Sequence, residues 1–192
     1  MHSNKTLGLT LLVATIAIAG CAKKEPAADT VSSAPVEAPP PAAAALTDPN
    51  IVYILDEANA ADSARGKLAE TKATSAEVKR FGRMMVGEHH GLRLLGQQLA
   101  TKLNVTPQAP AGDQSEAQTK QEMDTLRAIP KGKAWDKTYI DFEVVYHQAV
   151  LETATKALGA AQNAELKSLI QSAAPVIQRH LDAAKQIQQK LQ

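Results

Sequence analysis

Hydrophobic residues recur at three- to four-residue spacing in four long segments of the chain. This period predicts amphipathic helices over about residues 50–71, 75–103, 133–159 and 164–191, whereas no segment shows the two-residue alternation of a half-buried strand. Pro175 lies inside the last segment, but the apolar period resumes in register beyond it, so we expect a kink rather than an end. The pattern predicts an all-α domain over residues 48–192.

The ends of these helices carry recognisable signals. Asp48 before Pro49 is typical of an N-cap followed by the first helical residue, and Asn163 is a second candidate N-cap. Thr74 stands three residues before Glu77, the spacing of a capping box. We expect the third helix to end near Gly159.

The connections are short, long and short. Residues 104–132 join the second and third helices, and they contain three prolines and a predicted short helix over about 115–127. A single long crossover favours a ferritin-like four-helix bundle, in which the chain is carried back along the bundle between helices 2 and 3. The alternative is an up-down-up-down bundle with a long disordered loop.

Ionisable side chains share the predicted core stripes. At about 100° per residue, residues 7 or 11 positions apart lie on nearly the same side of a helix. Six ionisable residues are aligned in this way with apolar core residues, or stand one turn from such a residue: Asp62, Glu88, His89, Glu143, His147 and His180. Folding each hairpin at its turn puts His89 opposite Glu57 and Asp62 opposite Met84. It also puts His180 opposite Glu143, roughly 7 Å from the level of His147.

Burying such groups singly costs several kcal/mol, so we expect them to meet one another or a ligand. Three histidines with one or two carboxylates suit a divalent metal, Zn, Fe, Mn or Cu. The alternative is that each histidine is a hydrogen-bonded core residue. His90 points about 100° away from His89 and should face solvent, and Met84 and Met85 are more simply core fillers than copper ligands. Gly82, Gly87, Gly91 and Gly96 suggest close helix approach in the second helix.

The N-terminal segment predicts export. An apolar run from Leu7 to Ala19 is too short to span a bilayer, and Gly20 and small residues precede the single cysteine, Cys21. The motif resembles the bacterial lipobox, which implies removal of residues 1–20 and lipidation of Cys21; a short transmembrane anchor is the alternative. Ala22 rather than Asp after the cysteine favours the outer membrane, periplasmic face. Residues 21–47, rich in Ala and Pro, should form a disordered tether.

Composition narrows the chemistry further. The net charge of +1 makes nucleic acid an unexpected partner, and 3% aromatic residues argue against an all-β fold. One cysteine excludes an intramolecular disulfide and any cysteine-rich metal site. The chemistry of the bundle is therefore left to histidines and carboxylates.

Three segments resemble the DUF4142 family: RMMVGEH at 83–89, WDKTYI at 135–140 leading to His147, and Ala174-Pro175 leading to His180. The resemblance implies an exported, ferritin-like four-helix domain of unknown function over residues 48–192. It singles out His89, His147 and His180, with Glu88 where the family usually shows Asp. The Glu-x-x-His pairs of di-iron proteins are absent, which disfavours ferroxidase chemistry.

Two functional hypotheses follow. The first is a lipid-anchored periplasmic bundle, held on the membrane by its anchor, that binds a metal ion or small ligand through its inward histidines and carboxylates. The second is a non-catalytic envelope interaction or stress-related protein whose core histidines are structural. No motif specifies a hydrolase or a redox enzyme, the third and least favoured alternative, and no protein partner is specified.

Overall fold

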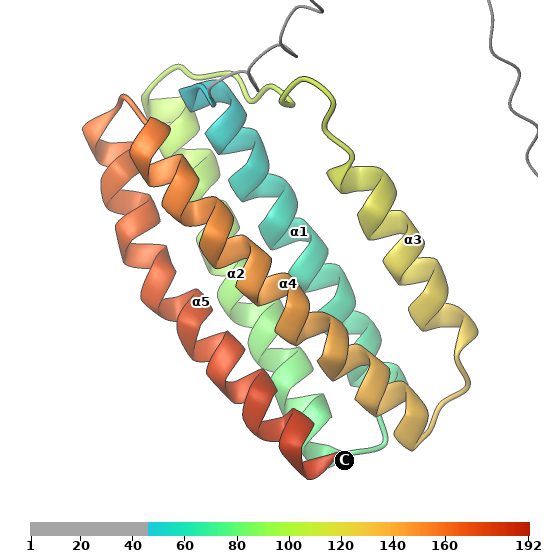
Figure 1. The fold of residues 1–192 in the computed structure, drawn as a ribbon. Helices are drawn as coiled ribbons and strands as arrows, with labels where there is room; N and C mark the ends of the chain where they lie inside the picture. Colours follow the sequence, from blue (N-terminus) through green and yellow to red (C-terminus); the bar gives the residue numbers. More distant parts are fainter. Residues whose placement is uncertain (1–45) are drawn as a thin grey trace, which may run out of the picture. The chain divides into compact units, whose positions relative to one another are not determined.

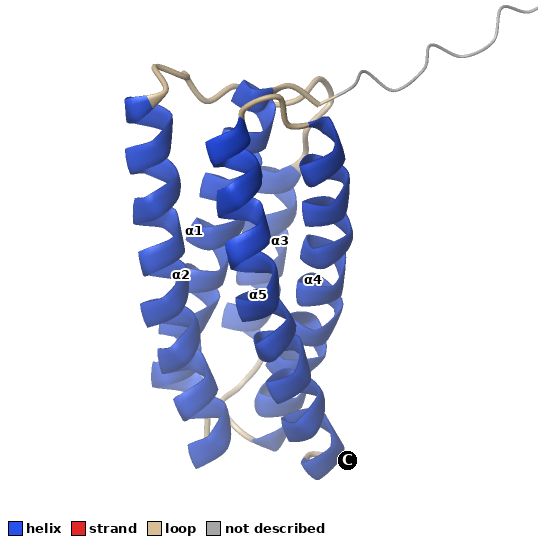
Figure 2. Ribbon diagram, turned by 90° about the vertical axis from the view of Figure 1, so that its left-hand side faces the viewer, coloured by secondary structure: helices blue, strands red, loops and turns tan. Residues whose placement is uncertain are grey.

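The computed structural model describes residues 46–192, and this part of the chain consists of five α-helices and their connections (Figure 2). The helices are α1 (Asp48–Lys72), α2 (Ala76–Lys102), α3 (Ser115–Ala128), α4 (Lys133–Ala160) and α5 (Ala164–Lys190). The four long helices and the short crossover helix agree with the sequence prediction. The predicted signal peptide, Cys21 and most of the tether lie outside the described residues.

The four long helices form a bundle with a ferritin-like path. The main packing partners are α1 with α2, α2 with α5, α5 with α4, and α4 with α1. Figure 1 shows α1 and α5 running in one direction and α2 and α4 in the other, so each helix packs against antiparallel neighbours. The crossover through α3 joins α2 to the diagonally opposite α4, which confirms the ferritin-like topology over the simple up-down arrangement.

Two helix starts differ from the prediction by one residue. Thr47, not Asp48, caps α1, and it forms a reciprocal capping box with Asn50. The Asp48 carboxylate instead accepts backbone hydrogen bonds from Gln162 and Asn163, at 2.8 and 3.0 Å, and so binds the start of α1 to the α4–α5 turn. A contact between distant segments, rather than helix capping, therefore determines what the Asp48 carboxylate binds.

Ser75, not Thr74, caps α2, and its hydroxyl accepts from the backbone N–H groups of Glu77 and Val78. Thr74 is occupied elsewhere, because its N–H and hydroxyl donate to the buried carboxylate of Asp136 on α4. The predicted cap Asn163 does begin α5, and α5 continues through Pro175.

Close approach of α1 and α2 depends on one glycine pair. A Cβ atom added at Gly66 would lie 2.6 Å from the carbonyl oxygen of Gly82, and one added at Gly82 would lie 2.9 Å from that of Gly66. By contrast, added Cβ atoms at Gly87, Gly91 and Gly96 meet nothing within 4 Å. The predicted role in helix approach is therefore correct for Gly82 and wrong for the other three, which face open space.

The core consists of two hydrophobic clusters with a polar layer between them along the bundle. One cluster surrounds Trp135, Tyr139 and Phe81, and the other surrounds Ile51, Leu166 and Ile170. Met85 belongs to the first cluster and Met84 packs against it, as their assignment as core fillers predicts. Between the clusters lie seven buried polar residues, from Asn59 and Asp62 on α1 to His180 on α5.

The crossover helix α3 is attached to the bundle near its C-terminal end. The Lys72 ammonium donates to the carbonyl oxygens of Leu126, Arg127 and Ile129 at 2.5–3.0 Å, and the Trp135 indole N–H also donates to Leu126. These bonds satisfy carbonyls that the helix end leaves free. Within residues 46–192, no helix combines the length and apolar character needed to cross a bilayer.

Candidate metal centre

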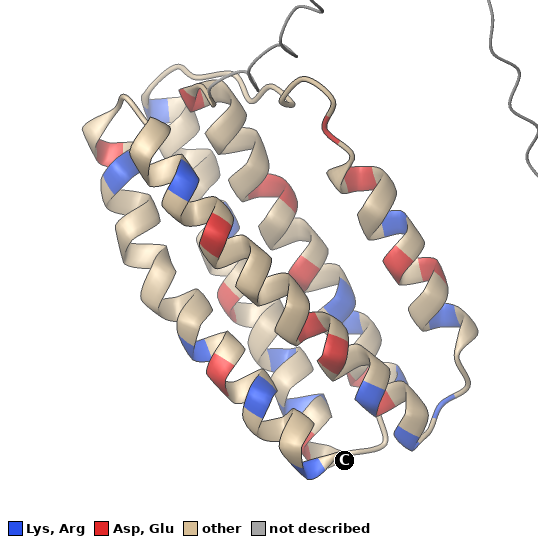
Figure 3. Cartoon of the chain, viewed as in Figure 1, with Lys and Arg blue, Asp and Glu red and all other residues tan. Residues whose placement is uncertain are grey.

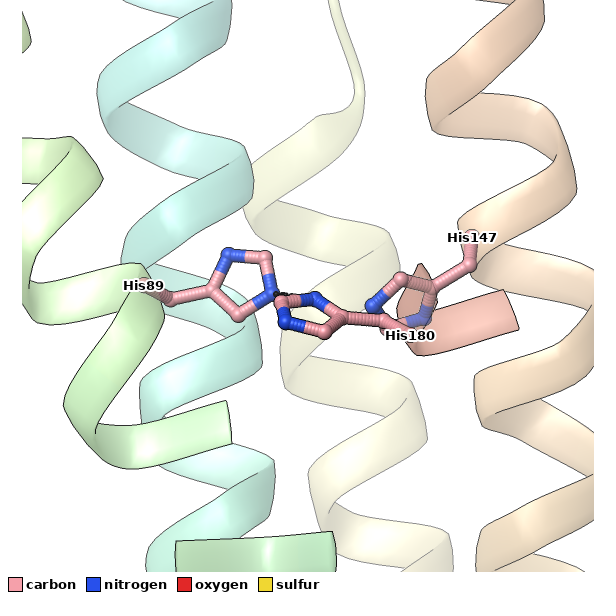
Figure 4. Close-up of side chains that lie close together, drawn as sticks. All are labelled: His89, His147 and His180. Atoms are coloured by element: carbon pink, nitrogen blue, oxygen red, sulfur yellow. Dashed lines mark hydrogen bonds between the residues drawn. The ribbon is translucent and has the colours of Figure 1, made fainter. Parts of the chain in front are cut away.

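Three histidines from three helices meet in the polar layer. His89 on α2, His147 on α4 and His180 on α5 are all buried, with relative exposures of 2%, 0% and 0%. Their ring centroids are 4.9 Å (His89–His180), 5.4 Å (His147–His180) and 5.7 Å (His89–His147) apart. Figure 4 shows the three rings pointing toward one another.

Each histidine ring has one nitrogen held by an oxygen outside the trio. His89 Nδ1 lies 2.8 Å from Asn59 Oδ1, His147 Nδ1 lies 2.8 Å from the carbonyl oxygen of Glu143, and His180 Nε2 lies 3.0 Å from Glu88 Oε2. The Asn59 amide is oriented by its own NH₂ group, which donates to the carbonyl of Leu55 at 2.6 Å. All three partners therefore present acceptors, and we assign the ring hydrogens to the outer nitrogens.

In the neutral tautomers that result, the inner nitrogens carry lone pairs. These are Nε2 of His89, Nε2 of His147 and Nδ1 of His180. His89 Nε2 and His180 Nδ1 are 3.1 Å apart, and the buried His147 Nε2 has no hydrogen-bond partner. Three lone pairs thus converge in a buried space, an arrangement that a proton or a metal ion stabilises.

At neutral pH, protonation does not supply a hydrogen to the contact between His89 Nε2 and His180 Nδ1. Burial, followed by repulsion from His180 and His147, lowers the pKa of His89 to about 3. Burial is also the largest influence on His180 and lowers its pKa, although its bond to Glu88 opposes the shift. Both rings are therefore neutral near pH 7, which is the form that coordinates metals.

His147 behaves differently because carboxylates surround it. Burial alone would lower its pKa, but the adjacent Glu143 carboxylate, the charge of Asp62 and the hydrogen bond from Nδ1 to the Glu143 carbonyl outweigh burial and raise the pKa. His147 Nδ1 is 3.3 Å from Glu143 Oε2. The surroundings of this ring thus favour a positive charge, whether carried by a proton or by a metal ion.

A buried arginine holds the two carboxylates in place. Arg65, with 0% exposure, donates from Nη2 to Asp62 Oδ1 at 2.6 Å and from Nε to Glu143 Oε1 at 3.1 Å. Its Nη1 reaches Glu122 on α3 at 3.1 Å, and its guanidinium stacks 3.8 Å above the Tyr146 ring. One oxygen of each buried carboxylate, Asp62 Oδ2 and Glu143 Oε2, is left without a hydrogen-bond partner.

The free carboxylate oxygens lie beside the histidines. Asp62 Oδ2 is 3.5 Å from His89 Nε2. Donor atoms of His89, His147 and His180 all lie within 4.8 Å of one another, and so do donor atoms of Asp62, Glu143 and His147. One arginine between two carboxylates leaves this buried group with a net negative charge when both are ionised.

The structure brings all six sequence-predicted bundle residues into or beside this layer. Asp62, Glu143 and the three histidines are buried, whereas Glu88 is 36% exposed and reaches His180 from the surface, where it also accepts from Arg179 at 2.7 Å. His90 is exposed, as predicted.

The residues that face each other across neighbouring helices differ from those expected by folding each hairpin at its turn. His89 contacts Asn59 and Asp62 rather than Glu57. His147 and His180 also meet despite their offset. Side chains on a helix lean toward its N-terminus, so on antiparallel neighbours they converge: His147 and His180 lean toward each other's level, as do His89 and Asp62.

Sequence reasoning missed Arg65, Asn59 and Glu122. Arg65 follows Asp62 by three residues and Asn59 precedes it by three, so all three share one face of α1. That spacing was the available signal for the first two. Glu122 lies on the crossover helix, and no pattern within α1 or α4 identifies it as a partner of Arg65.

The fold and this layer define the class: a ferritin-like four-helix domain with a buried cluster of histidines and carboxylates. The chain belongs to the DUF4142 family, since residues 33–187 match the family described as "Domain of unknown function (DUF4142)". No curated protein matches the chain.

Among solved structures, the chain is similar to CopM in the Cu(II)-bound form. The TM-score is 0.60 at 14% sequence identity, and the match covers 78% of this chain and all of the CopM chain. Similarity at this identity shows a shared fold.

Proposed function

We propose that the domain binds one divalent transition-metal ion, with Cu(II) the first candidate, through His89, His147 and His180. The observation that carries the proposal is the convergence of three ring nitrogens whose opposite nitrogens are all held by oxygen acceptors. Ligating histidines characteristically donate their second ring hydrogen to a carbonyl or carboxylate, which orients the ring and raises its basicity.

The distances suit such an ion. Two nitrogen ligands at about 2.0–2.1 Å from one metal lie about 2.9–3.4 Å apart at ordinary bond angles. His89 Nε2 and His180 Nδ1 are separated by 3.1 Å. The free Oδ2 atom of Asp62, 3.5 Å from His89 Nε2, is a candidate fourth ligand.

The choice of ion rests on donor chemistry and on the fold neighbour. Imidazole nitrogens suit Zn, Cu, Fe and Ni, and among divalent ions Cu(II) binds most tightly to a given nitrogen and oxygen site. The structure with the similar fold is CopM in its Cu(II)-bound form. This similarity supports Cu(II) as the first ion to test.

The full chain, purified without a histidine tag and stripped with a chelator, provides the test. We expect it to retain about one Cu(II) per chain after desalting, with nitrogen hyperfine structure in its electron paramagnetic resonance spectrum. His147→Gln should weaken binding at least about a hundredfold, because it removes one of three ligands. The matched control is His90→Gln, since His90 is exposed beside His89 and should leave binding unchanged.

Failure of the wild-type chain to retain Cu(II), Zn(II), Mn(II) or Fe(II) would overturn the proposal and favour structural histidines. Equal retention by His147→Gln and wild type would also contradict it. Circular dichroism of each variant separates loss of a ligand from loss of the fold.

We also propose that the protein is anchored by lipid on Cys21 at the periplasmic face of the outer membrane. The support is the apolar segment ending in Ala19-Gly20-Cys21, followed by Ala22. Fractionation of cells expressing wild type or Cys21→Ala tests this: wild type should be found with outer membranes and the variant should not. Recovery of the wild-type protein in a soluble fraction would contradict the anchor.

A further inference from the structure

A cleft lies between α1 and α4 beside the crossover helix. Its volume is about 410 Å³, which falls within the usual range of about 300–1,000 Å³ for small-molecule sites. α5 contributes Ile170, Ala173 and Ile177 to its lining, so the cleft extends between α1 and α4 into the bundle. Figure 1 shows α3 standing beside these two helices.

Most of the lining is apolar. α1 contributes Ile54 and Ala58, and α4 contributes Phe142, Val145 and Ala149. Val145 is 70% exposed. The α3 side is polar, with Ser115, Gln118 and Thr119 among its residues. The cleft therefore offers one apolar wall and one polar wall to a ligand.

All of the charged groups that line the cleft are acidic. They are Glu57 on α1, Asp113 just before α3, and Glu122 on α3, and no Lys, Arg or His is among the described lining residues. Glu122 is paired with Arg65, whereas Glu57 and Asp113 form no ion pair within the described residues. Asp113 Oδ2 accepts hydrogen bonds from the backbone N–H and the hydroxyl of Ser115, at 3.3 and 2.7 Å. Figure 3 shows acidic residues on both α1 and α3.

The shift in the pKa of Glu57 agrees with an excess of negative charge around this residue. Burial raises its pKa, and the nearby carboxylates of Glu116, Asp56 and Asp113 raise it further. Arg93 opposes this shift, but its guanidinium is already bound by Asp56 at 2.8 and 2.9 Å. A cation in the cleft would relieve repulsion that the protein's own basic residues leave in place.

We propose that this cleft binds a small organic cation with an apolar body, the body lying against α1 and α4 and the cationic group beside Glu57 and Asp113. The part of α1 that lines the cleft, from Ile51 to Ala58, spans about 10 Å, which is enough for an eight-carbon chain. The proposal does not require a bound metal ion, because none of the three histidines lines the cleft. Glu122 and Tyr146, which do line it, contact Arg65 of the polar layer.

Calorimetric titration of the metal-free full chain with three ligands of one chain length tests the proposal: octyltrimethylammonium, octanol and octanoate. At pH 8 and low salt we expect the cation to bind about tenfold more tightly than octanol, because charge attraction in a partly buried site strengthens only the binding of the cation. Octanoate should bind least, because the acidic groups repel it. Equal affinities for octanoate and the cation would overturn the proposal.

Two variants locate the binding. Glu57→Gln combined with Asp113→Asn should abolish the preference for the cation over octanol while leaving the octanol affinity unchanged. Ala149→Phe should weaken all three ligands, because its ring fills the cleft; Ala117→Phe is the control, since Ala117 is exposed on α3 outside the lining. A cation preference that persists in the double variant, or undiminished binding by Ala149→Phe, would contradict the proposal.

Discussion

His89 and His180 face each other through two ring nitrogens, and the acceptors bound to the opposite nitrogens assign both facing atoms as lacking a hydrogen. Nε2 of His89 lies 3.1 Å from Nδ1 of His180, while Asn59 and Glu88 hold the opposite nitrogens as donors. A hydrogen bond between the two inner atoms needs an additional proton, and burial lowers the pKa of both rings. The metal-free protein therefore keeps an unsatisfied contact at its centre, which a bound cation would satisfy.

The low pKa of His89 predicts a loss of stability in acid. In the unfolded chain His89 binds a proton near pH 6.5, whereas in the folded chain it does so only at about pH 3. Between these values the unfolded state holds more protons, so the free energy of unfolding falls as pH decreases, by up to about 1.4 kcal/mol per pH unit from this group. Urea unfolding of metal-free protein at pH 4, 5 and 6 measures the slope.

The contribution of His89 is isolated by His89→Asn, which cannot titrate. The variant should show a shallower slope between pH 4 and 6 than wild type. His180 contributes with the same sign, since its pKa is also lowered, while His147, with a raised pKa, adds stability that is lost as pH rises through that value. Identical slopes for wild type and variant would contradict the assignment of His89 as a neutral buried ring.

Asn59 should act as a positioning residue for the metal ligand His89. Its Oδ1 atom accepts from His89 Nδ1, which leaves Nε2 as the donor to a metal. We expect Asn59→Leu to weaken Cu(II) binding about 10- to 100-fold, because the ring loses its orienting acceptor. Asn59→Asp restores an acceptor and should recover most of the affinity, measured by competition with a chelator of known strength. Equal affinities for Leu and Asp variants would contradict this role.

Arg65 is predicted to be the most sensitive charged residue of the bundle. Replacing it with Met leaves Asp62 and Glu143 buried without their counter-ion, which should cost about 3–5 kcal/mol in the free energy of unfolding. Arg93→Met is the matched control, because Arg93 is 40% exposed and its pair with Asp56 should contribute about 1 kcal/mol or less. Urea unfolding at pH 7 compares the two, and similar losses would contradict a special role for Arg65.

Much of this architecture was predictable from periodicity. The 3.6-residue pattern located four long helices, the length of the 104–132 segment indicated the crossover, and the alignment of His89, His147 and His180 with apolar residues placed them inward. These features depend on neighbours within one helix, and a sequence displays such neighbours directly.

The partners across helices were not predictable in the same way. Asp48 and Asp136 could each have capped the start of the helix in which they lie. Each instead accepts hydrogen bonds from a segment more than 60 residues away. The contact of Arg65 with Glu122 depends on where the crossover helix lies, which no spacing within either helix specifies. Side chains lean toward the N-terminus of their helix, and this lean determines which residues of neighbouring helices come into contact. Counting residues from the turn of each hairpin does not include it.

The glycines of the α1–α2 interface offer a test of the packing itself. Gly66→Ala places a Cβ atom 2.6 Å from the backbone oxygen of Gly82, so the two helices must separate, and we expect a loss of roughly 1–3 kcal/mol. Gly87→Ala meets nothing within 4 Å and should instead stabilise α2 by up to about 1 kcal/mol, because alanine favours a helix interior. Thermal unfolding of the two variants beside wild type measures this difference in sign, and a stabilised Gly66→Ala variant would show that the helices are not packed through this pair.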